Sequence, residues 1–395
     1  MKLYSIIAYI LYVGSVNDLE HIIYLDNSST TKPCERSVEC INKALKSFWG
    51  NPSSLHALGL DAELEVDEAR AFLAKIISAN KDEIIFTGSG TEANNTAVMS
   101  VSNSRNKRII TTLIEHPSVL ETVKRLEEKG FEVVRLGCDK NGIINLKELE
   151  NALDDKVCLV SIMLVNNEVG SVQPIAEASK LIKKLAPNAL FHCDAVQGFG
   201  KLPINVKTLG VDLLSASAHK IHGPKGIGFL YCKKGTKLNP LITGGGQEKG
   251  LRSGTESVPL IMGFKGAAEQ IGDLKANENY IKELNHYARE LFASSGFITI
   301  NSPENALPYI LNISIAGYRS ETLLHFLENK NIFVSSGSAC AKGKPSYVLE
   351  ALGLNRTLAD SALRLSFSRY NTKEDINLTF AALNEAVKKL RKSNI

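Results

Sequence analysis

The sequence predicts an α/β fold with two parts: a large domain built on a mostly parallel sheet flanked by helices, and a smaller α+β domain. Two observations carry this prediction. Strand and helix patterns alternate as far as Cys232, and the order of these patterns changes after Pro259. Such alternation is typical of a parallel sheet with helices on both faces. With 395 residues, 44% of them hydrophobic, the chain is longer than one typical domain and can bury a substantial core.

Short apolar runs and helical patterns define the elements of the large domain. An amphipathic helix is expected from His56 to Ser78, where apolar residues recur at roughly helical spacing among charged ones. Strands are predicted at Glu83 to Phe86, Arg108 to Thr112, Glu132 to Arg135, Val157 to Val165, Ala189 to Cys193, Val211 to Leu214 and Gly228 to Cys232. Helices are predicted between them at Val119 to Glu128, Leu146 to Leu153 and Ile175 to Leu185.

The C-terminal part mixes strands and helices in a different order. A long helical region is expected from Leu260 to Ala293. It is followed by strands at Ile298 to Asn301, Ile310 to Ile315 and Ile332 to Ser335, and by helices at Ser320 to Lys330 and Lys373 to Arg391. The first strand is expected at Ile22 to Leu25. We therefore predict a large domain over residues 34–270, a small domain made of 22–33 and 271–395, and a dispensable N-terminal extension over 1–21.

Composition excludes several classes of protein. A net charge of +4 is weak for this length, and no basic run is interleaved with aromatic residues, so direct binding of nucleic acid is not expected. Seven scattered cysteines without a Cys-x-x-Cys pair argue against a disulfide framework and against a metal site. The apolar stretch Leu3 to Gly14 is too short to span a bilayer and has no clear cleavage site after it. These observations predict a cytoplasmic protein that does not bind membranes.

Lys220 directly follows the predicted strand Val211 to Leu214, in a segment rich in hydroxyl and imidazole groups. An aldehyde cofactor such as pyridoxal 5'-phosphate (PLP) needs a lysine amine on a rigid strand end for its Schiff base, and donors beside it for its phosphate. Ser217 and His219 are the candidate donors. An ordinary surface lysine in a Gly-Pro turn also fits this segment taken alone.

Two further segments suit the same cofactor. The turn Gly88-Ser89-Gly90-Thr91 lies between a short strand and a helical pattern, so backbone N–H groups at Gly90 and Thr91 can cradle a phosphate. His116 follows the strand Arg108 to Thr112, and its flat imidazole can stack on a pyridine ring and move protons. Small-residue turns and single loop histidines are common, so neither feature decides the function alone.

Polar side chains near two other strands complete the predicted site. Asp194 follows Ala189 to Cys193, and a carboxylate there can keep a pyridine nitrogen protonated, which makes the ring an electron sink. Asn167 and Gln197 are candidate donors to the ring hydroxyl. Each of these would more often be an exposed turn residue if taken singly. Together they all fall near the carboxyl ends of predicted parallel strands, where ligands of open α/β sheets bind.

The order of phosphate turn, histidine, asparagine, aspartate and lysine resembles the PLP-dependent enzymes of aminotransferase class V, which have PLP fold type I. Within that superfamily the chain resembles the cysteine desulfurase family, the NifS/IscS-like enzymes, because Ser335-Ser336-Gly337-Ser338-Ala339-Cys340 adds a cysteine that ordinary aminotransferases do not use. Matching stretches begin at Tyr24-Leu25-Asp26-Asn27 and continue through Gly50-Asn51-Pro52-Ser53-Ser54, Gly244-Gly245-Gly246-Gln247-Glu248, Arg252-Ser253-Gly254-Thr255-Glu256 and Arg364-Leu365-Ser366.

The resemblance implies a role for each matching residue. It makes Lys220 the Schiff-base lysine, His116 the stacking residue and Asp194 the partner of the pyridine nitrogen. The resemblance gives the phosphate to Thr91, Ser217 and His219, and the substrate carboxylate to Arg364, with Asn167 also close to the substrate. Thr255 in this family reaches the phosphate of the neighbouring subunit, which implies a homodimer with shared active sites.

Cys340 carries the specific function that the resemblance implies. Small residues and Lys342 and Lys344 surround it, a setting that favours the thiolate. The loop departs from the family pattern because only four residues separate Cys340 from Pro345, fewer than in many members. This shorter spacing affects how far the Cys340 thiol can reach and which protein acceptor it can serve.

The predicted reaction removes sulfur from L-cysteine to give L-alanine and a persulfide on Cys340. The persulfide would then pass to a protein acceptor, either an iron-sulfur scaffold or a tRNA-thiolation enzyme. Two alternatives stay open: a selenocysteine lyase or another class V aminotransferase or lyase, and a non-catalytic sulfur carrier or assembly subunit.

Overall fold

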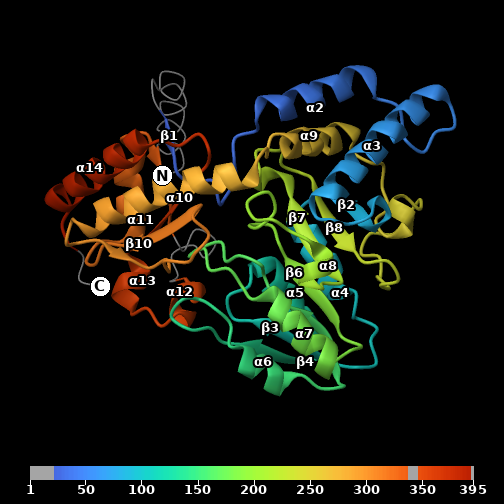
Figure 1. The fold of residues 1–395 in the computed structure, drawn as a ribbon, viewed down its shortest axis with the longest axis horizontal. Coiled ribbons are helices and arrows are strands. Elements are labelled where there is room, and N and C mark those ends of the chain that lie inside the picture. The colour runs from blue at the N-terminus through green and yellow to red at the C-terminus, as the bar shows by residue number, and fades with distance from the viewer. Residues whose placement is uncertain (1–21, 337–345, 393–395) are drawn as a thin grey trace, which may run out of the picture.

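A seven-stranded sheet forms the centre of the larger part of the molecule (Figure 1). The computed structural model describes residues 22–336 and 346–392. Across the sheet the order is β2 (Ile84–Thr87), β8 (Gly228–Cys232), β7 (Leu213–Ser217), β6 (Leu190–Asp194), β5 (Val157–Ser161), β3 (Arg108–Thr112) and β4 (Glu132–Leu136). β8 is antiparallel to both of its neighbours, and the other pairs are parallel. The predicted mostly parallel sheet is confirmed.

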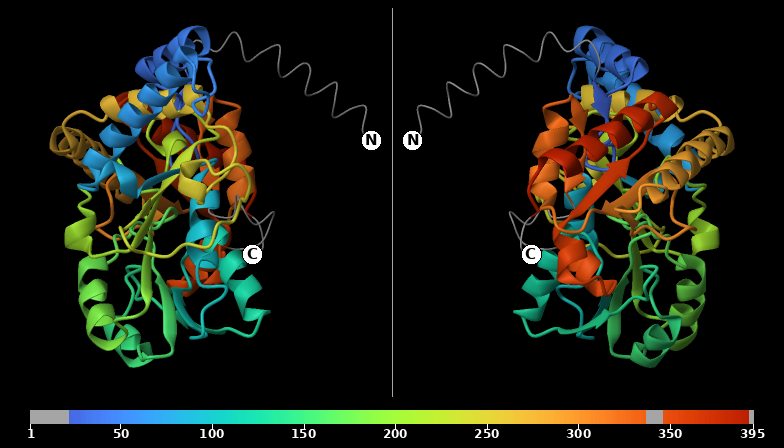
Figure 2. Two further views of the ribbon diagram at one scale, coloured as in Figure 1. Left: turned by 90° about the vertical axis from the view of Figure 1, so that its right-hand side faces the viewer. Right: turned by 90° about the vertical axis from the view of Figure 1, so that its left-hand side faces the viewer.

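Helices cover both faces of this sheet, as expected for strands joined by helical crossovers. They are α3 (Ala57–Ile76), α4 (Gly90–Met99), α5 (Pro117–Glu127), α6 (Leu146–Ala152), α7 (Ile175–Leu185) and α8 (Val206–Leu209). The left view of Figure 2 shows α7 on one side of the sheet and α4 and α5 on the other. The prediction missed α2 (Glu35–Ser47), which packs against α9 (Val258–Glu269) and donates a hydrogen bond from Ser37 Oγ to the carbonyl oxygen of Gly263.

The C-terminal part contains a four-stranded antiparallel sheet. Its order is β12 (Ser335–Ser336), β13 (Ala362–Ser366), β10 (Ile310–Ser314) and β9 (Thr299–Ile300). The helices of this part are α10 (Leu274–Ala293), α11 (Ser320–Glu328), α12 (Tyr347–Ala351), α13 (Arg356–Asp360) and α14 (Lys373–Lys389). The first strand, β1 (Ile23–Tyr24), pairs in parallel with β11 (Ile332–Phe333), so the N-terminal segment lies beside the C-terminal part.

One apolar core runs through both parts of the molecule. In the larger part of the molecule, Phe199, Phe229 and Phe264 pack together with ring centroids 5.3 to 5.9 Å apart. The same cluster of buried residues continues to Leu311 and Leu365 on the small sheet. The proposed division of the chain at residues 33 and 270 stays a prediction. Among the described helices, none has both the length and the apolar character needed to cross a bilayer.

Several predicted elements differ in their bounds; the strand predicted at Val211 to Leu214, for example, is β7 at Leu213–Ser217. Three of the differences have a local reason. The helical region Leu260 to Ala293 is two helices, because Gly272 has a φ of 64° and Asp273 caps α10 by accepting from two backbone N–H groups. The strand Val157 to Val165 ends at Ser161, since the chain then turns around the side chain of Asn166. The strand Ile332 to Ser335 is divided between β11 and β12, which belong to different sheets.

Candidate active site

A cavity of about 320 Å³ opens at the carboxyl ends of the parallel strands. Ten of the predicted site residues line it: Gly90, Thr91, His116, Asn167, Asp194, Gln197, Ser217, His219, Lys220 and Arg364. The topology explains this convergence, because β2, β3, β6 and β7 all run in the same direction and their carboxyl ends meet at one edge. The structure brings these residues together, and their individual roles stay predictions.

One end of the cavity is built for an anion. Ser89 caps α4 by accepting from the N–H of Glu92, and Gly90 begins the helix, so the positive end of its dipole faces the cavity. A Cβ at Gly90 would come within 2.7 Å of Val196 Cγ2, so only glycine leaves this space open. The hydroxyl of Ser217 is buried and has no hydrogen-bond partner among the described residues. A phosphate group at this end would supply its missing partner.

Asp194 ends β6, and both of its carboxylate oxygens accept hydrogen bonds. Oδ1 accepts from the backbone N–H of Val196 at 2.9 Å, and Oδ2 accepts from Asn94 Nδ2 at 2.7 Å. Asn94 lies on α4 and also donates to Ser118 Oγ at 2.9 Å. These bonds hold the carboxylate in one orientation in the cavity wall, as a partner for a ring nitrogen requires.

His116 caps α5 and presents its ring to the cavity. Its Nδ1 accepts from the backbone N–H of Ser118 at 3.1 Å, so the proton of the neutral ring is on Nε2. Burial lowers the pKa of His116; Asp194 opposes this shift and Lys220 adds to it. The ring is therefore a neutral imidazole at neutral pH, suited to stacking and to passing the Nε2 proton.

Lys220 lies in a single 3-10 turn, Ala218–Lys220, directly after β7. Its amine donates to the carbonyl oxygens of Ser28 and Ser29 at 2.6 Å each. The segment containing these two serines thus closes the cavity over the lysine. His219 Nδ1 lies 3.2 Å from Thr30 Oγ1, and burial lowers the pKa of His219 to about 4, so this ring is neutral as well.

Arg364 lies on β13 and lines the cavity. Its guanidinium donates to the backbone oxygen of Asn167 at 2.9 Å, to Asp26 Oδ1 at 2.8 Å and to Ser29 Oγ at 2.7 Å. Its Nε atom is buried and has no partner among the described residues. A guanidinium held in this way offers a planar donor set to an incoming carboxylate.

Gln197 is a predicted donor to the ring hydroxyl, but the protein itself already contacts both ends of its side-chain amide. Its Nε2 donates to the carbonyl oxygen of Ser28 at 2.8 Å, and its Oε1 accepts from Lys201 Nζ at 3.0 Å. Both ends of the amide are therefore engaged by the protein, and one N–H remains for a ligand.

Thr255 is not among the residues that line this cavity. Thr255 lines a separate cavity of about 150 Å³ together with Thr87, Glu248 and Arg252. Cys340 lies outside the described residues. The segment that follows it begins with Ser346, whose hydroxyl donates to Glu168, and Tyr347, whose hydroxyl donates to the backbone oxygen of Glu115 at 2.7 Å. Glu168 and Glu115 are each adjacent in the sequence to a predicted site residue.

The sequence reasoning missed Asn94, Ser118, Ser28 and Ser29. Asn94 lies three residues after Thr91, on the helical face that follows the phosphate turn, and this spacing was the available signal. Ser28 and Ser29 contribute backbone oxygens, which the residue type cannot reveal. Within the described part of the chain, no group of three or more histidine, cysteine or acidic side chains is arranged to hold a metal ion.

Glu115 lies beneath the cavity and is fully buried. Its Oε1 accepts from the backbone N–H of Met163 at 2.8 Å and from Thr112 Oγ1 at 3.0 Å, while Oε2 has no partner among the described residues. Burial, with a further contribution from the charge of Asp194, raises the pKa of Glu115 to about 8. The group is therefore a neutral carboxylic acid at neutral pH.

The fold and this site define a class V aminotransferase, and the chain belongs to that family: the model described as "Aminotransferase class-V" matches residues 23–378. A relative named "Cysteine desulfurase IscS", from Dictyoglomus turgidum, is 42% identical over 377 residues, which cover 93% of this chain and 95% of the relative. The mitochondrial cysteine desulfurase of Saccharomyces cerevisiae is 42% identical over 379 residues, covering 93% of this chain and 76% of the relative.

Solved structures agree with these relatives. A structure titled "NIFS-LIKE PROTEIN" superimposes with a TM-score of 0.89 at 38% identity, covering 94% of this chain and all of the other. An apo cysteine desulfurase from Thermococcus onnurineus gives a TM-score of 0.85 at 26% identity, covering 95% of this chain and 96% of the other. Within the class V family the chain is thus a member of the cysteine desulfurases, and its cofactor is PLP.

Asn94→Ala should weaken the binding of PLP to the apoprotein by about tenfold, the size expected when a charged group loses one hydrogen bond. The reason is that Asp194 loses its bond to Nδ2 and can turn away from the ring nitrogen. Titration of apoprotein with PLP, followed by absorbance, measures the effect. Asn95→Ala is the matched control, since Asn95 donates to the backbone oxygen of Ser118 instead. Equal affinities for the two variants would contradict the role given to Asn94.

Glu115→Gln should flatten the dependence of stability on pH. The unfolded carboxyl has the ordinary pKa of 4.5 and the folded one about 8, so the folded state keeps this proton over the range between them. Its contribution is complete below the lower value and is lost as pH rises through the upper one, by at most about 1.4 kcal/mol per pH unit. Urea unfolding of the PLP-loaded protein at several pH values in this range measures the slope.

Glu121→Gln, an exposed change on α5, is the control for this experiment and should follow the wild-type curve. Parallel curves for Glu115→Gln and the wild type would show that Glu115 is already ionised in the folded protein.

Proposed function

We propose that this chain is a PLP-dependent cysteine desulfurase that takes sulfur from L-cysteine onto Cys340 and passes it to a protein acceptor. The convergence of Lys220, His116, Asp194 and Arg364 on one cavity carries the proposal, because these residues come from four strands and supply an amine, an imidazole, a carboxylate and a guanidinium. Family membership selects the reaction. The cavity also fits the cofactor, since Ser217 Oγ lacks a partner there and Gly90 leaves room for a phosphate.

When bound, PLP supplies an electron sink for the α-carbon of the substrate. Arg364 holds the substrate carboxylate through its planar donor set. The Lys220 amine takes the α-proton, and Asp194 keeps its carboxylate directed at the cavity. His116, with its proton on Nε2, can donate or accept at the substrate side.

The sulfur step balances without an external oxidant. The Cys340 thiolate attacks the substrate sulfur, an S–S bond forms, and the bond between that sulfur and the β-carbon breaks. The remaining three-carbon fragment takes protons and leaves as L-alanine. Overall, L-cysteine and the Cys340 thiol give L-alanine and a Cys340 persulfide. The acceptor is an iron-sulfur scaffold or a tRNA-thiolation enzyme, and the cytoplasm is the proposed compartment.

Cys340→Ala should lower the formation of alanine from cysteine by about two to three orders of magnitude, because the nucleophile is lost. The variant should still bind PLP and show its visible absorbance. Alanine and sulfide are measured in the presence of a reductant. Cys138→Ala is the control, because the Cys138 thiol donates a hydrogen bond to the backbone oxygen of Ala351, away from the cavity. Equal sulfide release from Cys340→Ala and the wild type, or alanine from selenocysteine alone, would contradict the proposal.

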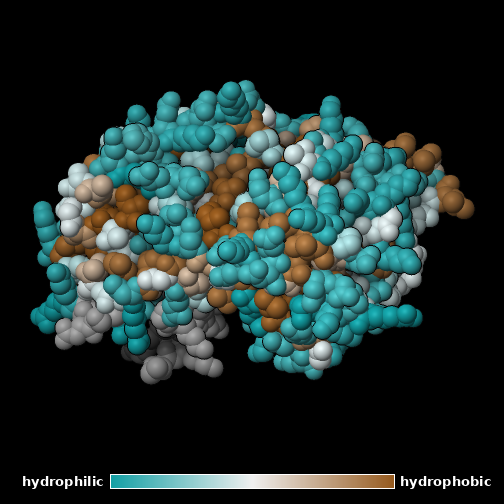
Figure 3. Space-filling view, turned by 60° about the horizontal axis from the view of Figure 1, so that its bottom comes forward, coloured by the Kyte–Doolittle hydropathy of each residue, from teal (hydrophilic) through white to brown (hydrophobic). Residues whose placement is uncertain are grey.

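Two observations support a homodimer in which Thr255 serves the partner's site. Thr255 is exposed and lies outside the cavity of its own chain. Several large apolar side chains are also exposed on α2, α3 and the segment between them, including Leu45, Trp49, Leu55 and Leu64, with Trp49 68% exposed. Figure 3 shows apolar surface at the end of the molecule where α3 lies in Figure 1. A second copy of the chain would cover such a surface.

Mixing two inactive variants tests the shared site. If Thr255 acts on the partner, a mixed dimer of Lys220→Ala and Thr255→Ala subunits contains one site in which both residues are intact. We therefore expect mixing by denaturation and refolding to restore sites with wild-type PLP affinity and activity. The separately refolded variants are the controls. Absence of recovery, in mixed dimers verified by a tag on each subunit, would place Thr255 in its own subunit's site.

A further inference from the structure

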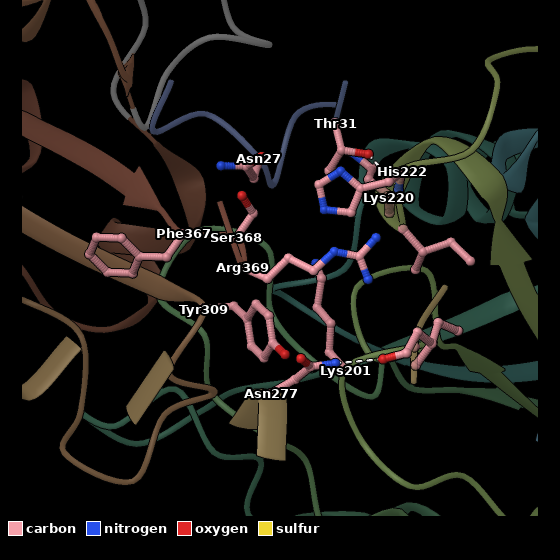
Figure 4. A pocket seen from close by; sticks show the side chains of 13 residues that line it. Asn27, Thr31, Lys201, Lys220, His222, Asn277, Tyr309, Phe367, Ser368 and Arg369 are labelled. Atoms are coloured by element: carbon pink, nitrogen blue, oxygen red, sulfur yellow. Dashed lines mark hydrogen bonds between the residues drawn. The ribbon is translucent and has the colours of Figure 1, made fainter. Parts of the chain in front are cut away.

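Lys201 is a buried lysine that the reaction described above does not use. It lies four residues after Gln197, is 7% exposed, and lines a small cavity of about 40 Å³ behind the active site. Figure 4 shows Lys201 and Tyr309 at the same end of this cavity, with Thr31 and His222 at the other. The amine is 5.8 Å from the centre of the Tyr309 ring.

The surroundings of this amine are unfavourable for a charge. In the described part of the chain, the charges that act on it are those of Lys220 and Arg364, and both are positive. Burial is the larger effect, and the pKa of Lys201 is lowered to about 7. The charge of Lys201 in turn contributes to lowering the pKa values of His219 and His222, the titratable rings near it. A lysine buried without a carboxylate costs stability, which indicates that the position serves another purpose.

Its contact with Gln197 suggests that purpose. A lysine amine in the ammonium form is only a donor, so the oxygen of the Gln197 amide must face it, and the two are 3.0 Å apart. The backbone oxygen of Ser28 is only an acceptor, so the amide nitrogen must face it, at 2.8 Å. Both partners therefore select one of the two amide orientations. In that orientation the second N–H of Gln197 is available to the active-site cavity.

We propose that Lys201 is a positioning residue that locks the Gln197 amide so that its second N–H faces the active site, where it donates to the ring oxygen of PLP. This inference rests on the proposed function, because it concerns the same cofactor. Without Lys201 the amide would lose one of the two contacts that orient it. A ring oxygen that loses a donor becomes more basic, so the protonation of the bound chromophore shifts to higher pH.

The test is the pH titration of the visible absorbance of the PLP-loaded protein. Lys201→Met keeps the length of the side chain and removes the donor. We expect the midpoint to rise by about one pH unit, which corresponds to the loss of one hydrogen bond to a charged acceptor. Thermal stability should be equal or higher, since a buried amine without a carboxylate partner has been replaced by an apolar group. Lys225→Met, an exposed lysine near the site, is the charge control and should leave the midpoint unchanged.

A double-mutant cycle shows whether Lys201 acts through Gln197. In a Gln197→Leu background, Lys201→Met should produce no further change in the midpoint. An additive change, or an equal shift in Lys225→Met, would overturn the proposal. A lower melting temperature with an unchanged midpoint would also overturn it, since that result describes a merely structural lysine. A wild-type protein without any PLP absorbance would instead refute the proposed function, and the two failures are therefore distinct.

Discussion

The parallel pairing of β6 with β7 is the constraint on which the site depends. Its register places Asp194 opposite Ser215, so Lys220 emerges five residues later at the same edge of the sheet. Hydrogen bonds between backbones set this register, and a slip of one residue in either strand would turn the side chains of that strand to the other face. β3 and the α4 turn add His116 and Gly90 around this pair.

The positive charge of the cavity is concentrated on lysine and arginine. The imidazoles around it are neutral: burial lowers the pKa of His116, and lowers those of His219 and His222 to about 4. Lys220 and Arg364 therefore provide the fixed charges that face a phosphorylated, carboxylated ligand. Neutral rings can stack and transfer protons without adding repulsion between cations. Because these imidazoles are neutral, histidines can lie beside two cationic groups in a buried site.

Local patterns were sufficient to predict the fold class and most of the cavity. Strand ends follow approximately from apolar runs, so Asp194, which ends β6, could be located from the sequence. Ser217 ends β7 three residues beyond the predicted strand Val211 to Leu214. Other features depend on contacts between distant segments. The reversal of β8 and the division of Ile332 to Ser335 between two sheets depend on partners that the local pattern does not contain. Lys201 has the sequence context of a surface lysine, and only its burial distinguishes it.

The docking of the N-terminal segment has a consequence for biosynthesis. Ile23 pairs with Ile332, and the bridge from Asp26 reaches Ser366, so residues at the start of the chain find their partners only near its end. The backbone oxygens that hold the Lys220 amine belong to this segment. A ribosome must therefore release the chain beyond Ser366 before this segment can be fully docked over the lysine, so the enclosure of Lys220 is a late, long-range step of folding.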